Sequence, residues 1–130
     1  MLDLNILAAL LAAVGAFMIS GAYYAALGTQ LARLSPAYAE AGRSTAATNV
    51  VELMRNLVLA GVVSGLAAGL GLDSFAESLL LALALWVGFP VVLLVGSVFH
   101  ERVPPMLAAM HSGDWFLKLV AVAGVVTVWR

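Results

Sequence analysis

The sequence predicts an all-α protein, a bundle of four transmembrane helices with both termini on the extracytoplasmic side. Of its 130 residues, 64% are hydrophobic and only 10% are charged, and the mean hydropathy is +1.08. Soluble domains carry about 25% charged residues, and a globule of this size has too little interior to bury so much apolar surface. Lipid is therefore the expected solvent, which argues against a soluble enzyme. The formal net charge of −1 leaves no basic surface for nucleic acid.

Four apolar segments follow one another along the chain, separated by polar or turn-forming residues. A helix of about 20 residues crosses the hydrocarbon core of a bilayer, and each segment is long enough to do so. We expect a single membrane domain over 1–130, with spans at about 4–27, 50–72, 76–99 and 108–129.

The first connection, 28–49, is the longest polar stretch. Ser35 and Pro36 form a helix-starting pair and Gly42 is a helix-ending residue, so a short interfacial helix is expected here. A mobile loop is the alternative.

Two features define the third span. Ser74 and Glu77 have the spacing of a capping box and predict its N-terminus. Because the preceding turn is tight, we expect the second and third spans to pack as antiparallel neighbours. Pro90 lies near the middle of the span and cannot bond the carbonyl of Trp86, which predicts a kink. Trp86 itself is expected to pack within the protein rather than to bind a ligand.

The basic residues indicate the orientation, because cytoplasmic connections are enriched in Lys and Arg. Five of the six belong to, or lie nearer to, the side of the first and third connections: Arg33, Arg43, Arg55, Arg102 and Lys118. Only Arg130 lies on the other side. This bias predicts a multi-pass protein of the inner (plasma) membrane with its charged connections in the cytoplasm.

Polar residues inside the second and fourth spans form a predicted charge cluster. At about 1.5 Å of rise per residue, Arg55 and Asp114 lie at the same depth, roughly one turn inside the cytoplasmic boundary. Because these spans run in the same direction, their charges are expected to meet. The cluster consists of Glu52, Arg55, Asn56, His111, Asp114 and Lys118.

Two interpretations of the cluster remain open. It is a structural clamp, with Arg55 on Asp114 and Lys118 on Asp114 or Glu52, or it is a solute site or a path for protons or ions. The two carboxylates and two cations sum to zero, which favours the clamp, because a cation carrier needs an unpaired carboxylate.

Small residues repeat at four-residue spacing in two spans. Gly61, Gly65 and Gly69 form such a row in the second span, a pattern that lets helix backbones touch in lipid. We expect it to pack against a second copy or another membrane protein rather than within one chain. The first span has a similar row: Ala8, Ala12, Ala16 and Ser20. The paired Tyr23 and Tyr24 beyond it are expected to be interfacial anchors.

No residue pattern predicts enzyme chemistry. The chain has no cysteine, no glycine-rich phosphate loop outside an apolar helix, and no serine in a nucleophile elbow. Its two histidines, His100 and His111, lie in separate segments and lack the spacing of a zinc site. We therefore expect no catalytic residue, no metal and no cofactor.

Short motifs in a fixed order resemble a family of small bacterial integral-membrane proteins, domain of unknown function 1761. The resemblance covers nearly the whole chain, most clearly from Ala76 onward. It implies the four-span fold and no activity. It rests on Gly21-Ala22-Tyr23-Tyr24, Trp86-Val87-Gly88-Phe89, Gly96-Ser97-Val98, Glu101, Pro104 or Pro105, Leu107, Gly113 and Trp129.

The predicted function is that of a small non-enzymatic membrane protein, a self-associating subunit or an accessory subunit of a larger membrane assembly. Its expected partners are the lipid bilayer and either its own copies or another membrane protein. The alternative is an oligomeric small-solute or proton-coupled transporter that uses the charge cluster. A membrane enzyme acting on lipid or quinone is the third possible function.

Overall fold

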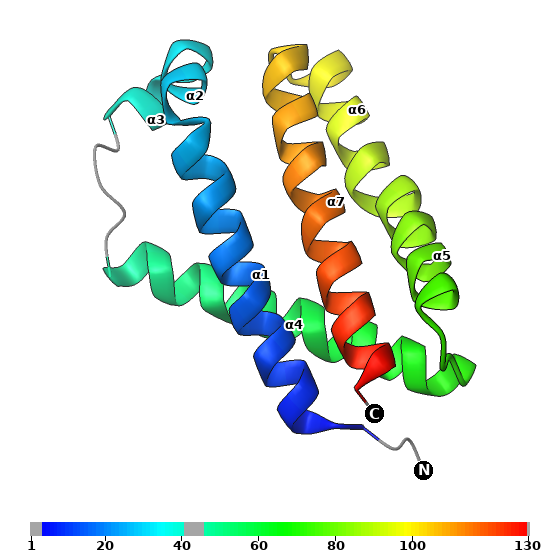
Figure 1. Ribbon diagram of the computed structural model, residues 1–130. Coiled ribbons are helices and arrows are strands. Elements are labelled where there is room, and N and C mark those ends of the chain that lie inside the picture. The colour runs from blue at the N-terminus through cyan, green and yellow to red at the C-terminus, as the bar shows by residue number, and fades with distance from the viewer. Residues whose placement is uncertain (1–3, 41–45, 130) are drawn as a thin grey trace.

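The computed structural model describes residues 4–40 and 46–129, and these residues contain helices and no strand, which confirms the all-α class. The helices, shown in Figure 1, are α1 (Ile6–Ala26), α2 (Gly28–Leu34), α3 (Pro36–Glu40), α4 (Ala46–Leu70), α5 (Phe75–Trp86), a π-helical turn η1 (Val87–Val91), α6 (Val92–His100) and α7 (Pro105–Val128).

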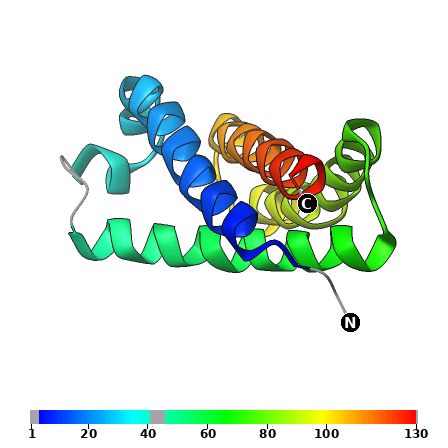
Figure 2. The ribbon, with the colours of Figure 1, turned by 60° about the horizontal axis from the view of Figure 1, so that its bottom comes forward.

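Helices α1, α7 and α5–η1–α6 form one layer, and α4 crosses this layer. Helix α7 lies between α1 and the continuous α5–η1–α6 helix, and α4 runs across α1 and α7 on one face of this layer (Figures 1 and 2). The expectation that the second and third spans pack side by side is therefore wrong, because α5 packs mainly on α7. Gly71, with φ +67°, ends α4 and redirects the chain. The Leu72 amide bonds the Ala67 carbonyl and the Gly71 amide bonds the Ala68 carbonyl, which together form a Schellman motif.

Side-chain caps fix two helix starts. The side chains and backbones of Ser74 and Glu77 bond one another at the start of α5, so the predicted capping box is confirmed. Asn5 caps α1 by accepting a bond from the Ala8 amide at 3.0 Å. The Asn5 amide also donates to the carbonyl of Trp129 at 3.0 Å, which ties the start of α1 to the end of α7.

The connection between α1 and α4 is more helical than expected. The predicted short helix is present as α3, while Gly42, its expected end, lies outside the described residues. Helix α2 was not predicted, because its first residues, Gly-Thr-Gln, read as a loop. Leu31, which is only 1% exposed, anchors α2 in the fold.

Pro90 lies in a helix that continues past it. The irregularity expected near Pro90 takes the form of the π-helical turn η1, which joins α5 to α6 without a break in the helix. Single π turns are a common way for a helix to absorb such an interruption.

The core is built from small side chains, which lets the helices approach closely. Alanines of α1 and α4 meet valines and leucine of α7. The core residues are Ala12, Ala13, Ala16, Ala60, Val63, Ala67, Ala82, Leu119, Val122, Ala123 and Val126.

Large apolar side chains cover the outside, as in a protein that faces lipid. Within the part of the chain that the structure describes, three helices are long and apolar enough to cross a membrane: Ile6–Ala26, Ala46–Leu70 and Phe75–His100. Helix α7 has 24 residues but is not among them, and it carries His111, Asp114 and Lys118. The composition and these three helices indicate a membrane protein.

Candidate functional site

Three buried polar side chains meet where α1 contacts α7. Asp114 is 2% exposed and Lys118 3%, and Ser20 of α1 is also buried. The Ser20 hydroxyl donates to Oδ1 of Asp114 at 2.6 Å, and Lys118 Nζ lies 3.0 Å from Oδ2. Both carboxylate oxygens thus have a partner. We call Ser20, Asp114 and Lys118 the Asp114 cluster.

The local sequence explains why these groups meet. Asp114 and Lys118 are four residues apart and therefore share one face of α7, with the acidic residue on the favourable N-terminal side. The Lys118 ammonium also lies 4.3 Å from the centre of the Trp115 ring, an attractive cation–π geometry. Ser20 ends the row of small residues on α1, and this row brings the two helices close enough for a direct hydrogen bond.

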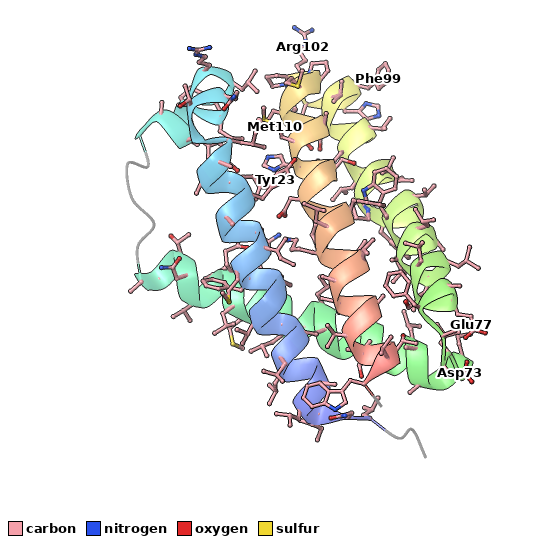
Figure 3. All side chains as sticks on the ribbon, in the orientation of Figure 1. Tyr23, Asp73, Glu77, Phe99, Arg102 and Met110 are labelled. Carbon is pink, nitrogen blue, oxygen red and sulfur yellow. The ribbon has the colours of Figure 1, made fainter. Side chains whose placement is uncertain are left out.

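One turn further along, two tyrosines of α1 bind α7. The Tyr23 hydroxyl donates to the carbonyl of Met110 at 2.7 Å, and Figure 3 shows the two residues facing each other between the helices. The Tyr24 hydroxyl and Nδ1 of His111 share a hydrogen bond of 2.6 Å. Gly113 leaves room for the Tyr23 side chain, because a Cβ at position 113 would lie 2.5 Å from the Tyr23 hydroxyl oxygen.

Helix α3 adds a third ring to this contact. The Tyr38 ring stacks on Tyr24 with centroids 6.3 Å apart and lies 6.2 Å from the His111 ring. Partial burial, and then the negative charges of Glu52 and Asp114, raise the pKa of the Tyr38 hydroxyl above its usual value. Tyr38 therefore acts as a neutral packing group at physiological pH.

Trp86 binds α7 from the opposite side. Its indole Nε1 donates to the carbonyl of Ser112 at 2.9 Å, and its ring meets Phe116 edge to face with centroids 5.3 Å apart. Trp86 therefore packs within the protein, as its mid-span position predicts.

The predicted charge cluster is divided into two parts. Arg55 forms an ion pair with Glu52 on the exposed side of α4, so the expected contact of Arg55 with Asp114 is wrong, whereas that of Lys118 with Asp114 is confirmed. Arg55 and Asp114 would lie at the same depth only if α4 and α7 ran side by side, but α4 crosses α7. Asn56 is buried and donates to the Glu52 carbonyl at 2.9 Å rather than to the Asp114 cluster.

Arg55→Ala is expected to change the free energy of unfolding by less than about 1 kcal/mol, because an exposed ion pair contributes little. The Arg55 side chain is 55% exposed. Unfolding in mild detergent with increasing SDS measures the effect, with Arg55→Lys as the control that keeps the charge. A loss as large as that of a Lys118 variant would contradict this placement of Arg55.

Ser20, Tyr23 and Tyr24 were not predicted to belong to the polar site between α1 and α7. Ser20 was recognised only as part of a row of small residues, and the tyrosines as interfacial anchors. The row itself was the useful indication, because a serine that replaces alanine in a close helix contact places a hydroxyl against the next helix.

The described part of the chain offers no grouping of three or more His, Asp and Glu side chains that could hold a metal ion. What the arrangement provides is two hydrogen-bonded groups along the α1–α7 contact, Tyr24 with His111 and Ser20 with Asp114 and Lys118. Such groups can fasten two helices in lipid.

A model of the family described as "Protein of unknown function (DUF1761)" matches residues 7–127. No curated protein and no solved structure matches the chain significantly.

Proposed function

The chain belongs to the DUF1761 family, whose function is unknown, and we propose that it is a small non-enzymatic subunit of a membrane assembly. It associates with its own copies or with a larger membrane complex. The observation that carries the proposal is an uncovered helix surface, which we call the α4 outer face. It consists of Met54, Val58, Gly61, Val62, Gly65 and Gly69.

The α4 outer face lies opposite the side that α4 buries. The buried side consists of Asn56, Ala60, Val63 and Ala67, and Ser64 lies at its edge, in a groove that Gly61 also lines. On the outer face Val58 is 65% and Val62 56% exposed, and a Cβ added at Gly61 or Gly65 would meet nothing within 4 Å. A row of glycines gives lipid nothing to bind, whereas it allows another helix to approach closely. This supports packing against a further protein chain.

The Asp114 cluster supports a structural role for the buried charges. Each carboxylate oxygen of Asp114 is bonded, and the lysine lies beside it, so the group has a balanced charge. A buried, paired group of this kind fastens α1 to α7 and leaves no unbonded Asp114 carboxylate oxygen for a substrate.

We further propose that α7 is the fourth span, that the protein is a multi-pass protein of the inner (plasma) membrane, and that both termini are extracytoplasmic. The bond between Asn5 and the Trp129 carbonyl supports this, because it places the start of α1 and the end of α7 at one end of the layer. Arg102 lies at the opposite end (Figure 3), where the more basic connections fit the cytoplasmic side.

Gly65→Leu tests the proposed function. The leucine is expected to hold the partner helix away, so the particle purified in mild detergent should fall to the mass of a single chain. Gly96→Leu is the matched control, since a Cβ at Gly96 in α6 also meets nothing within 4 Å. An unchanged mass and unchanged co-purifying proteins for Gly65→Leu would contradict the proposal.

Proton-coupled transport is the second candidate, and the titratable side chains His111, Asp114 and Lys118 on α7 favour it. In a transporter, Asp114→Asn removes transport while the protein accumulates normally. In a structural fastener the same variant lowers accumulation, so measuring abundance together with proton flux in vesicles separates the two.

A further inference from the structure

Ser64 is the buried polar residue of α4 that faces a groove. It is 6% exposed, and no hydrogen bond joins its hydroxyl to any residue in 4–40 or 46–129. The serines of the neighbouring helix differ, because Ser78 donates to the Phe75 carbonyl at 2.7 Å and Ser97 to the Leu93 carbonyl at 3.2 Å. In lipid an unbonded hydroxyl is costly, so an acceptor that entered the groove would gain a hydrogen bond from Ser64.

The groove beside Ser64 lies next to the α4 outer face. It has a volume of about 190 Å³ and runs between the start of α1, with Ile6 and Leu10, and Gly61 and Ser64 of α4. A second groove of about 580 Å³ lies on the other side of the same face, where Val58 and Val62 approach Trp115 of α7. The outer face of α4 is thus a ridge between two apolar grooves.

This ridge is complementary to itself. Val58 and Val62 project from it at four-residue spacing, and Gly61 and Gly65 leave recesses at the same spacing. Two such surfaces fit when the valines of one lie over the glycines of the other, as in ridges-into-grooves helix packing.

We infer that the α4 outer face binds a second copy of this chain about a two-fold axis, with Ser64 donating a hydrogen bond across the contact. The inference rests on the proposed function and names its partner. A two-fold axis places the same surface of both copies together. The charges on this side of α4, Glu52 and Arg55, sum to zero, so two copies meet without net repulsion, and each Arg55 can approach the Glu52 of its partner.

Cysteine cross-linking tests this contact in native membranes, because the chain contains no cysteine. Under mild oxidation Val62→Cys is expected to give a homodimer, since a two-fold contact brings equivalent residues near each other. Leu93→Cys is the control, because its side chain is 73% exposed and α6 packs on α7 rather than on α4. Both positions are exposed, so neither substitution disturbs the core.

Ser64→Ala in the Val62→Cys chain tests the hydrogen bond. One interhelical hydrogen bond in a membrane alters association by about threefold, so the cross-linked fraction is expected to fall by about that factor at limiting expression. Gly61→Leu in the same chain is expected to abolish the cross-link.

The outcomes separate this inference from the proposed function. A homodimer at Val62 that Gly61→Leu abolishes supports the inference. Cross-linking of Val62→Cys to a different protein would overturn it while leaving the subunit role intact. Equal homodimer yields at Val62 and Leu93 would show random collision and overturn it. No cross-link, together with a single-chain particle mass, would overturn both.

Discussion

Lys118→Met is expected to destabilise the protein by about 3–5 kcal/mol, because it leaves the Asp114 carboxylate buried without its cation. Asp114 is 2% exposed, and its remaining side-chain partner is the Ser20 hydroxyl. A loss of this size is a large share of the total stability of a small domain. It should appear as a sharp fall in the amount of protein in the membrane and as unfolding at a lower SDS fraction in mild detergent.

The control removes the whole Asp114 cluster. Replacing a buried ion pair with apolar residues of similar volume is often neutral or stabilising, so the triple variant Ser20→Ala, Asp114→Leu, Lys118→Met should recover most of the lost stability. A triple variant as unstable as Lys118→Met would contradict this explanation. A stable triple variant that fails in the cell would instead show that the cluster has a function beyond fastening.

Gly113→Ala has the second largest expected effect, a loss of roughly 1–3 kcal/mol from overpacking. The new Cβ would lie 2.5 Å from the Tyr23 hydroxyl oxygen and 3.3 Å from its Cζ. Tyr23 cannot move aside without losing its bond to the Met110 carbonyl. Thermal unfolding followed by circular dichroism in mild detergent measures the change.

Two comparisons make the Gly113 test specific. Gly124→Ala lies on the same helix, but its Cβ would approach Phe75 only to 3.4 Å, so it should be close to neutral. Tyr23→Phe removes the clashing oxygen, so Gly113→Ala should be less costly in a Tyr23→Phe background than in the natural chain. Equal stability of the two alanine variants would mean that α1 and α7 are not in tight contact at Tyr23.

Local features of the fold were predictable from the sequence. The apolar segments gave the all-α class because hydrophobic length alone decides it. The Ser74–Glu77 capping box was also predictable, because all of its atoms lie within one helical turn.

The direction of α4 was not predictable, and this explains the error at Arg55. The amphipathic pattern of a helix gives its buried face but not the angle at which that face crosses its neighbours. Counting residues from Leu72 places Arg55 level with Asp114 only if both helices are parallel. The bond between Ser20 and Asp114 joins residues 94 positions apart, a pairing that no local pattern specifies.

The central place of α7 has a consequence for how the protein is made. Helices α1, α4 and α5–α6 are long and apolar enough to cross a membrane, and they are synthesised before α7. Helix α7 carries Asp114 and Lys118, and charged residues at such positions make spontaneous insertion unfavourable. In the four-span arrangement that we propose, α7 therefore inserts beside helices already in the membrane, where Ser20, Tyr23 and Tyr24 of α1 bond its polar groups. Mutations of Ser20, Tyr23 or Tyr24 on α1 should therefore reduce the insertion of α7, even though these residues lie in a different helix.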